Sequence, residues 1–335
     1  MPVRPRLTPA IADVRRAVRA ALPAVDPDRD APLVLVGLSG GADSLALAAA
    51  TAFEGPRAGV GAGAVVVDHG LQPGSDAVAR AARDQALGLG CVDAHVIGVE
   101  VGGHGGPEAA ARSARYAALA DARGGAPVLI GHTRDDQAET VLLGLGRGSG
   151  PRSIAGMRPY DPPWGRPLLG IARSVTRGAC EELGLTPWQD PHNDDPRFTR
   201  VRLRHEVLPL LEDVLGGGVA EALARTAASL REDIDTLDDL AEAALATAAA
   251  GTGTGTRLDV TAVTGLPAAV RRRVIRRWLL AGGGNDLTDL QIRAVDRLVV
   301  DWRGRGGVAI GSSSPRQRLF AERRGGELIL RTEPV

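Results

Sequence analysis

A glycine-rich turn between two apolar segments is the first stretch of this sequence that could do chemistry. The residues of this turn are Ser39, Gly40, Gly41, Ala42, Asp43 and Ser44. The β-prone run Leu33 to Val36 precedes the turn, and the alanine-rich run Leu45 to Ala52 follows it as a predicted helix. Glycines let the backbone approach a ligand, and the start of a helix offers N–H groups and a positive dipole end. The pattern predicts a phosphate-binding loop, although not a Walker A loop, since that motif needs a lysine and the chain contains none.

Asp43 lies in the first turn of the predicted helix, where the helix dipole favours an acidic residue in any case. A second interpretation is that its carboxylate holds Mg²⁺ beside bound phosphates, since magnesium sites combine one or two carboxylates with substrate phosphates. The tight spacing of the loop in a strand–turn–helix context favours this second interpretation. We therefore expect Mg²⁺ as a cofactor.

A second group of candidate residues lies in the polar segment from His132 to Thr140, directly after the apolar run Val128 to Ile130. On a helix, Asp136 and Glu139 share one face. Acids in the first turn can be structural, and a buried histidine usually is. Acids at a ligand-binding edge also suit a cationic substrate or Mg²⁺, and His132 could contact a nucleotide. The residues alone leave these interpretations open.

Arginines supply all 40 basic residues, against 40 acidic ones, so the net charge is zero and gives no hint of a partner. Arg112 and Arg115 lie three apart on a predicted helix and could grip phosphates, although Glu108 could instead pair with Arg112 on the surface. Three further clusters could be solvated faces or contacts to a polyanion. Their members are Arg200, Arg202 and Arg204; Arg271, Arg272, Arg273, Arg276 and Arg277; and Arg316, Arg318, Arg323 and Arg324.

The two cysteines, Cys91 and Cys180, lie far apart and outside any Cys-x-x-Cys pattern. A disulfide framework, a zinc ribbon and an iron–sulfur cluster are therefore not expected. The N-terminal segment has no signal-peptide core, and no apolar run is long enough to span a bilayer. We expect a cytoplasmic protein that does not use a membrane.

Strands and helices alternate in the first part of the chain, which predicts an α/β fold with a doubly wound, mostly parallel sheet. The expected strands are 33–36, 63–67, 91–99 and 128–130, and the expected helices are 11–22, 43–53, 76–89, 107–122 and 134–145. Ligands of such sheets bind beyond the carboxyl ends of the strands. Ser39, Asp68 and His132 all follow such ends, so we expect these residues to converge.

The remaining chain predicts a smaller C-terminal helical and α+β domain. Residues 147–167 are rich in glycine and proline and predict an extended loop rather than more sheet. Helices are expected at 173–183 and 199–211, with a polar loop at 187–198 between them. We place an N-terminal domain at 1–215 and a C-terminal domain at 216–335, with a long helix over 219–249 and a linker over 251–256. Beyond the linker, we expect strands at 257–260, 307–310, 317–321 and 327–330, and helices at 268–280 and 288–300.

The loop resembles the pyrophosphate-binding loop of ATP pyrophosphatases, which split ATP into AMP and pyrophosphate. Over about residues 30 to 212 the chain also resembles one family of that superfamily, the tRNA(Ile)-lysidine synthases, and its length suits the short form. The motifs that carry the resemblance are Ser39 to Ser44, Val67 to Leu71, Glu108 to Tyr116, His132 to Thr140, Arg147 to Gly150, Arg166 to Leu169, and Trp188 to Asn193 with Phe198 to Glu206. The chain departs from the family pattern at Gly131, where a second histidine is usual, and at Val201, where asparagine is usual.

The resemblance implies an adenine nucleotide α-hydrolase-like fold and a reaction in two steps. ATP adenylates the C2 oxygen of the wobble cytidine in an isoleucine tRNA with a CAU anticodon, and pyrophosphate leaves. The ε-amine of L-lysine then attacks C2 and expels AMP. An amine must be neutral to attack, and its ordinary pKa of about 10.4 makes a nearby base or desolvation useful.

The resemblance also implies roles for individual residues of this sequence. ATP binding is expected from Ser39, Gly40, Gly41, Ala42, Asp43, Ser44, Arg115 and His132. Catalysis is expected from Asp43, Arg112, Asp136 and Glu139, with Asp43 as the metal ligand and the last two binding lysine. Binding of tRNA is expected from Arg200, Arg202, Arg204, Arg272 and Arg276.

Two other functions stay open at this point. A tRNA-thiolating enzyme would use a similar loop, but it would need paired cysteines or a cluster. A non-catalytic ATP-binding module would bind ATP without turning it over, and the Asp136–Glu139 segment and the basic appendage speak against it. The sequence does not give the oligomeric state, and a homodimer is one expectation.

Overall fold

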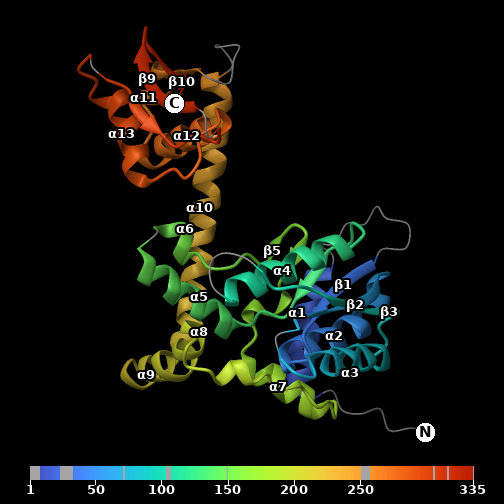
Figure 1. Cartoon of the computed structure of the whole chain (residues 1–335). Coiled ribbons are helices and arrows are strands. Elements are labelled where there is room, and N and C mark those ends of the chain that lie inside the picture. Colours follow the sequence, from blue (N-terminus) through green and yellow to red (C-terminus); the bar gives the residue numbers. More distant parts are fainter. Residues whose placement is uncertain are drawn as a thin grey trace. The chain divides into compact units, whose positions relative to one another are not determined.

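The computed structural model describes residues 8–22, 33–70, 72–102, 107–148, 150–249, 257–304, 306–314 and 317–334. These residues belong to two compact units, Met1–Ala228 and Ser229–Val335 (Figure 1). A search of the helices in these ranges finds none that is both long and apolar enough to cross a membrane.

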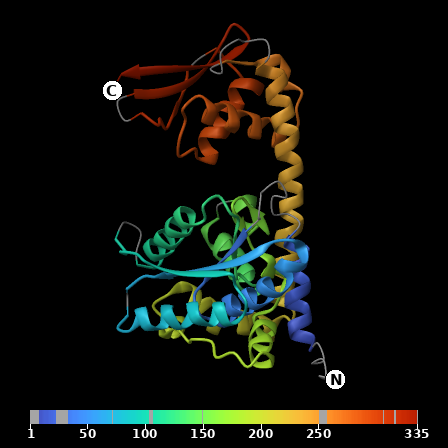
Figure 2. The same cartoon turned by 90° about the vertical axis from the view of Figure 1, so that its right-hand side faces the viewer.

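The N-terminal unit contains a sheet with helices on both sides (Figure 2). Its strands are β1 (Leu33–Leu38), β2 (Gly61–Asp68), β3 (Asp93–Gly98), β4 (Val128–Ile130), β5 (Tyr160–Asp161) and β6 (Trp164–Gly165). Its longer helices are α1 (Pro9–Ala21), α2 (Ala42–Glu54), α3 (Ser75–Gly88), α4 (Pro107–Ala122), α5 (Arg134–Arg147) and α7 (Arg173–Glu182). Its short helices are η2 (Gly55–Ala58), α6 (Pro151–Ile154), η3 (Pro167–Gly170), η4 (Pro191–Asp194), α8 (Thr199–Arg202), the π turn η5 (Leu203–Val207) and α9 (Leu208–Val214).

The six strands lie in the order β3-β2-β1-β4-β6-β5. All neighbouring pairs are parallel except β5 with β6, so the predicted α/β class with a mostly parallel sheet is confirmed. The chain moves outward from β1 to β3 and then returns to the other side of β1 with β4. The strand order therefore reverses between β1 and β4, and doubly wound sheets bind ligands at the carboxyl ends of the strands at such a reversal.

Both faces of the sheet are covered, which explains why its strands are continuous apolar runs. Val34, Val36 and Leu38 of β1 pack into one core cluster, together with side chains of α1, α2, α3 and α7. Leu35 belongs to the opposite cluster, with Leu119 of α4. Two filled cores therefore hold β1 in place, and the loop that follows β1 starts from a fixed point.

The prediction that residues 147–167 form an extended loop rather than more sheet is wrong. This segment contains α6, β5 and β6, and β6 extends the sheet beyond β4 with Leu129 opposite Gly165. Gly165 fits because a Cβ there would lie 2.6 Å from Cδ2 of Leu129. Strands of two residues have no alternation of apolar and polar side chains, so the sequence pattern could not reveal them.

The long helix α10 (Val219–Ala249) begins in the N-terminal unit and ends in the C-terminal unit. The other C-terminal elements are β7 (Arg257–Asp259), α11 (Val260–Thr264), α12 (Ala268–Ala281), α13 (Asp289–Val300), β8 (Val308–Ile310), β9 (Gln317–Arg324) and β10 (Glu327–Pro334). The four strands form an antiparallel sheet in the order β7-β10-β9-β8 around a core that includes Trp278 and Leu328. The expected α+β appendage is confirmed, whereas the expected linker over 251–256 lies outside the described residues.

Candidate active site

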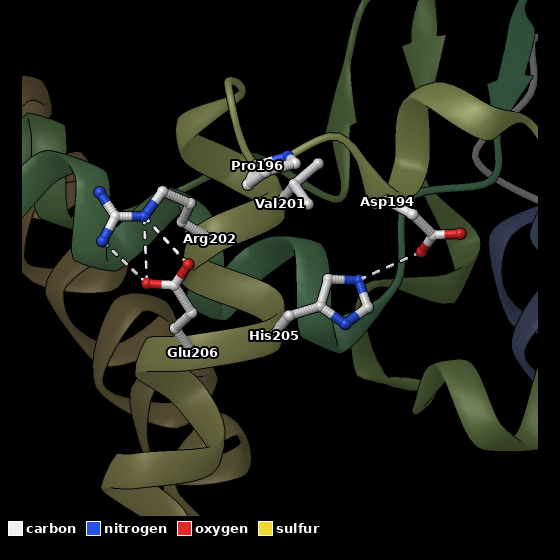
Figure 3. A pocket seen from close by; sticks show the side chains of 6 residues that line it. All are labelled: Asp194, Pro196, Val201, Arg202, His205 and Glu206. Carbon is white, nitrogen blue, oxygen red and sulfur yellow. Dashed lines mark hydrogen bonds and ion pairs between the residues drawn. The ribbon is translucent and has the colours of Figure 1, made fainter.

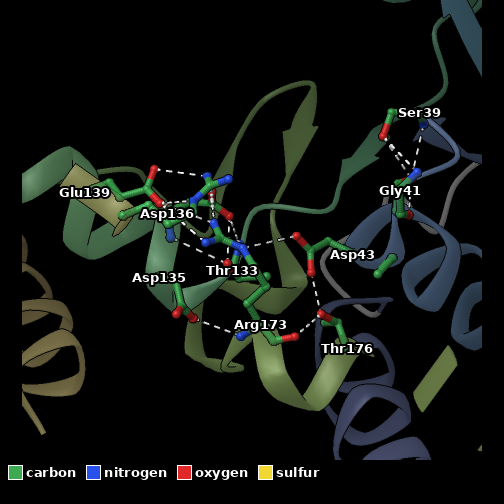
Figure 4. Close-up of polar contacts among 12 residues, drawn as sticks. Ser39, Gly41, Asp43, Thr133, Asp135, Asp136, Glu139, Arg173 and Thr176 are labelled. Carbon is green, nitrogen blue, oxygen red and sulfur yellow. Dashed lines mark hydrogen bonds and ion pairs between the residues drawn. The ribbon is translucent and has the colours of Figure 1, made fainter. Parts of the chain in front are cut away.

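The predicted phosphate-binding loop joins the end of β1 to the first turn of α2. Gly40 has a φ of 80°, a left-handed conformation that favours glycine. The Ser44 hydroxyl accepts a hydrogen bond from the backbone N–H of Ser39 at 3.1 Å. It donates a hydrogen bond to the carbonyl oxygen of Gly41 at 2.9 Å. Ser44 thus holds the turn in shape from inside the helix. Figure 4 shows Ser39 and Gly41 facing each other across this turn. The loop is preorganised by its own residues.

The end of β4 presses against this helix start. A Cβ on Gly131 would lie 3.0 Å from the carbonyl carbon and oxygen of Asp43 and 3.1 Å from the nitrogen of Ser44. Glycine at this position therefore lets the two strand ends approach closely. The segment that starts at His132 is in this way brought beside the loop, as the sequence predicted.

Asp43 points from the first turn of α2 toward α7 (Figure 4). Its carboxylate accepts a hydrogen bond from Thr176 and lies 3.6 Å from Nε of Arg173. Burial raises the pKa of Asp43 to about 6; Asp136 adds to the rise, while Thr176 and Arg173 oppose it. The negative charge is only partly compensated by the protein, which is the condition expected of a cation ligand.

Asp136 both caps helix α5 and carries charge. The backbone N–H and the hydroxyl of Thr133 each donate to its Oδ2 at 2.7 Å, which completes a capping box. Arg173 Nη2 donates to its Oδ1 at 2.6 Å. Burial alone would raise the pKa of Asp136, but Arg173 and the Thr133 hydrogen bonds outweigh it and hold that pKa below its ordinary value. Asp136 is therefore a stable carboxylate.

Glu139 is fully buried, with 0% of its side chain exposed, and arginines surround it. Its Oε1 accepts from Nε of Arg204 at 2.9 Å and from Nη2 of Arg173 at 3.3 Å. Nη1 of Arg200 lies 3.8 Å from its Oε2. Two arginines that the sequence predicted for tRNA thus meet an acid that it predicted for lysine.

Arg202 does not join this group. It is exposed and pairs with Glu206, one turn along the same helix, at 2.8 Å. Both side chains line a hollow of about 240 Å³, together with Asp194, Pro196, Val201 and His205. Figure 3 shows the His205 ring directed at Asp194 on the other side of this hollow.

Arg173 is the residue that the sequence reasoning missed. Its guanidinium lies between Asp43 on one side and Asp136 with Glu139 on the other, and its backbone N–H donates to Asp135 at 2.8 Å (Figure 4). A signal did exist, because Arg173 opens α7 and a cation is disfavoured at the positive end of a helix. An arginine in that position needs a compensating acid.

The other side of the site is positive. Arg112 is exposed and donates to the hydroxyl of Tyr116 at 3.2 Å, with its guanidinium 4.8 Å from the ring centre. Arg115, on the same helix, has a buried Nε without a hydrogen-bond partner. Burial lowers the pKa of His132 to about 3, with nearby arginines adding to the effect, so this imidazole is neutral. The predicted candidates are therefore split between an acidic and a basic half.

The predicted basic helix of the C-terminal unit, α12, is largely neutralised. Asp296 accepts from Arg271 at 2.6 Å and from Arg272 at 3.0 Å. The other pairs are Arg273 with Asp238 and Arg277 with Glu242. Arg276 has no ion pair or hydrogen bond from its side chain in the part of the chain that the structure describes, and it is half-buried. Arg316 of the third cluster lies outside the described residues.

Comparison with known proteins links these features to two families of domains. The PP-loop domain family matches residues 14–211, and the TilS substrate binding domain matches residues 258–328. A tRNA(Ile)-lysidine synthase from Mycobacterium tuberculosis is 68% identical over 300 residues, which cover 90% of this chain and 91% of the relative. One from Rhodococcus erythropolis is 62% identical over 323 residues, 96% of each chain.

A solved structure with a similar fold is the U34-tRNA thiolase NcsA from Methanococcus maripaludis with its [4Fe-4S] cluster. Its TM-score is 0.54 at 20% sequence identity, and the match covers 67% of this chain and 80% of that one. At this identity the likeness concerns the fold alone.

Proposed function

The chain belongs to the tRNA(Ile)-lysidine synthase family, and from this premise we propose how its residues divide the work of the reaction. Its activity is that of a tRNA(Ile)-lysidine synthetase. One observation supports this assignment of roles to the residues. The phosphate-binding loop and the acids of α5 are joined through Asp43 and Arg173, so the energy-supplying half and the amine-binding half are contiguous.

The loop from Ser39 to Ser44 would bind the phosphates of ATP through backbone N–H groups and the start of α2. The residues fit Mg²⁺, because Asp43 offers an undercompensated carboxylate and magnesium needs few protein ligands when phosphates are present. No group of three or more His, Cys, Asp or Glu side chains that could hold a metal occurs within the described ranges. We propose Asp43 as the magnesium ligand, where the ion would neutralise the departing pyrophosphate.

Lysine recognition would belong to Asp136 and Glu139. A carboxylate whose pKa is held low is a weak base, so Asp136 would bind an ammonium group of lysine rather than take its proton. Both oxygens of Glu139 already contact arginines, so this acid can take an ammonium group only if Arg173 or Arg204 gives way. Desolvation at this buried position would help to neutralise the attacking amine.

The tRNA would be held at several places. We propose Arg112 and Arg115 for phosphate contacts close to the chemistry, and Arg200, Arg202 and Arg204 along the helix that follows the polar loop. Arg272 and Arg276 would act in the C-terminal unit, where the TilS substrate binding domain matches. We also propose that the enzyme works in the cytoplasm, where tRNA is modified, and that it can form a homodimer.

Thiolation of tRNA, the other reaction that the sequence left open, is the activity named for the solved structure that shares this fold. The cysteines of this chain do not support it. Cys91 and Cys180 are both buried, and burial raises the pKa of each thiol to about 11. Thiolates are the form that carries sulfur or binds a cluster, so neither cysteine suits that chemistry.

The test follows two products of the reaction, the modified tRNA and AMP. The protein is mixed with ATP, Mg²⁺, labelled L-lysine and an isoleucine tRNA transcript with a CAU anticodon. We expect labelled lysine in the tRNA, and AMP release that needs both the tRNA and lysine. A transcript with uridine at the wobble position serves as the control, and AMP release from ATP in the presence of lysine but without RNA would contradict the proposal.

A further inference from the structure

Residues 183–198, the strap that joins α7 to α8, touch the phosphate-binding loop. The backbone N–H of Trp188 in the strap donates to the carbonyl oxygen of Gly40 at 2.9 Å. A Cβ on Gly40 would lie 3.7 Å from Cβ of Trp188, so the two backbones run close together there. The motif from Trp188 to Asn193 supplies none of the proposed ligand contacts, and its position beside the loop indicates another role.

The hydrogen bond from Trp188 sets the orientation of the peptide unit between Gly40 and Gly41. This peptide is trans, so its C=O and its N–H point in opposite directions. Because the carbonyl faces the strap, the N–H of Gly41 faces away from the strap, toward Ser39. Its nitrogen lies 3.5 Å from the Ser39 hydroxyl oxygen, beyond the usual length of an N–H···O hydrogen bond. This N–H can therefore donate to a stronger acceptor, such as a phosphate oxygen.

The residues of the loop do not fix this peptide unit by themselves. Ser44 bonds the N–H of Ser39 and the carbonyl of Gly41, which belong to other peptide units. Glycine adopts positive and negative φ about equally well, so a peptide between two glycines can turn over at little steric cost. A turned peptide would present a carbonyl oxygen, which repels phosphate. The bond from Trp188 selects the orientation that presents the N–H.

The strap is anchored on both sides of its contact with the loop. On one side, Oδ1 of Asp190 accepts from the side-chain amide of Gln72, which follows β2, at 2.8 Å. On the other side, the weaker anchor is the side-chain amide of Gln85 of α3, which donates to the carbonyl of Thr186 at 3.4 Å. Asp190 and Thr186 each lie two positions from Trp188, so both anchors restrain the N–H that reaches the loop.

We propose that Trp188 and Asp190 are positioning residues for the first step of the reaction. The strap holds the peptide between Gly40 and Gly41 with its N–H directed at the phosphates of ATP before ATP binds. Trp188 acts through its backbone N–H, and Asp190 acts by anchoring the strap, so neither side chain needs to touch the nucleotide. The inference rests on the proposed function, since adenylation is the step that would use this loop.

The first experiment separates the backbone of Trp188 from its side chain. Trp188→Pro removes the N–H, whereas Trp188→Ala removes the indole and keeps the N–H. The Kd of an ATP analogue with a methylene group between the α and β phosphates is measured with Mg²⁺ present. We expect Trp188→Pro to bind about tenfold more weakly than the wild type, the effect of one lost hydrogen bond, and Trp188→Ala to stay within about threefold. Equal losses for the two variants would assign the effect to the indole and overturn the proposal.

The second experiment tests the anchor at Asp190. Asp190→Ala removes the acceptor of the Gln72 amide and should weaken binding of the analogue about fivefold. Asp190→Asn keeps an acceptor oxygen and should recover most of that loss. Glu181→Ala, at an exposed position near the end of α7, is the control and should bind as the wild type does. If Trp188→Pro does not fold, the comparison of Asp190→Ala with Asp190→Asn decides the matter.

Steady-state kinetics distinguish positioning from a general loss of structure. In Trp188→Pro and Asp190→Ala, the KM for ATP should rise with the Kd of the analogue, while the KM for lysine and the Kd of tRNA stay within twofold. A merely structural role would lower the rate per mole of protein and leave the KM for ATP unchanged. That result, or equal weakening of analogue and tRNA, would overturn the proposal. Binding of the analogue needs neither tRNA nor lysine, so lysidine formation by the wild type tests the proposed function separately.

Discussion

Burial disfavours the negative charge of Asp43, and this charge lowers the stability of the folded protein without a bound cation. Its pKa is raised from 3.8 to about 6, so above pH 6 the folded state holds an ionised carboxylate that would be more stable in the unfolded chain. Asp43→Asn should therefore raise the free energy of unfolding by about 2 kcal/mol at pH 8, and the gain should vanish near pH 4. The same variant should lose roughly a hundredfold in pyrophosphate release. Denaturant unfolding at both pH values and a pyrophosphate assay check the two effects.

The control for this variant is Asp13→Asn, because Asp13 lies on α1 and pairs with Arg16 at the surface. It should change neither stability nor activity. Wild-type pyrophosphate release by Asp43→Asn would show that this carboxylate is not needed for the first step. Loss of lysine transfer alone would move Asp43 to the amine half of the site.

Arg173, unlike Asp43, stabilises the folded state, because its positive charge compensates the neighbouring buried carboxylates. Arg173→Gln leaves Asp43, Asp136 and Glu139 without their shared cation, and we expect a loss of about 2–3 kcal/mol in unfolding free energy at pH 7. Because the pKa of Asp136 is lowered in the fold, the stability it contributes is present above pH 3.8 and is lost at lower pH. The difference from the wild type should therefore shrink near pH 3.

Arg177→Gln is the matched control, because Arg177 lies one turn further along α7 and is exposed. Its effect should stay within about 0.5 kcal/mol. Equal losses for the two variants would mean that the ion pairs of Arg173 contribute nothing specific. Unfolding in urea at pH 7 and pH 3 gives both values.

The same physics acts between whole helices where α1 meets α2. Glu54, at the end of α2, is 1% exposed and accepts from Arg15 at 2.6 Å and from Arg19 at 2.8 Å, both on α1. Hydrogen bonds from these arginines, Arg19 first, lower the pKa of Glu54 to about 2. Glu54→Gln should cost about 2 kcal/mol at neutral pH, less than a fully buried pair, because Arg19 stays in water.

The sign of the pH dependence distinguishes this contact between α1 and α2 from the effect of Asp43. The stabilisation by Glu54 is complete above its unfolded pKa of 4.5 and disappears as the pH falls toward 2. The wild type and Glu54→Gln should therefore differ most at pH 7 and converge near pH 2. Glu100→Gln, at an exposed position, is the control, and a pH-independent difference would contradict the ion-pair argument.

Elements with a local signal could be predicted, and elements defined by distant partners could not. The apolar runs of β1, β2 and β4, with a glycine-rich turn after the first, identified the sheet and the loop. The two-residue strand β6 is defined by its pairing with β4, a distant partner beside which Gly165 lies close to the side chain of Leu129. In the same way, Arg173 looked like an ordinary start of a helix, since its acids lie more than 30 positions earlier in the chain. Sequence spacing describes one helix face, but it does not show which faces meet.

For the whole molecule, a zero net charge conceals strong local compensation. The arginines near residue 200 and those of α12 look like open basic patches in the sequence, but most of them contact carboxylates in the structure. Such pairs hold the arginines in position, but they leave less uncompensated positive charge to attract RNA. We therefore expect few net phosphate contacts and a modest salt dependence of tRNA binding.

Within α12, charge compensation distinguishes two proposed tRNA contacts. Arg276 has no carboxylate partner among the described residues, whereas Arg272 shares the buried Asp296 with Arg271. Arg276→Gln should weaken tRNA binding several-fold and reduce the slope of log Kd against log salt by about one, with little change in stability. Arg272→Gln should reduce that slope by less than Arg276→Gln does, because Asp296 already compensates part of its charge, and it should lower the unfolding free energy by about 1 kcal/mol. Filter binding of tRNA over a salt series and urea unfolding of both variants measure these effects. A larger loss of salt slope for Arg272→Gln than for Arg276→Gln would mean that Asp296 releases Arg272 when RNA binds.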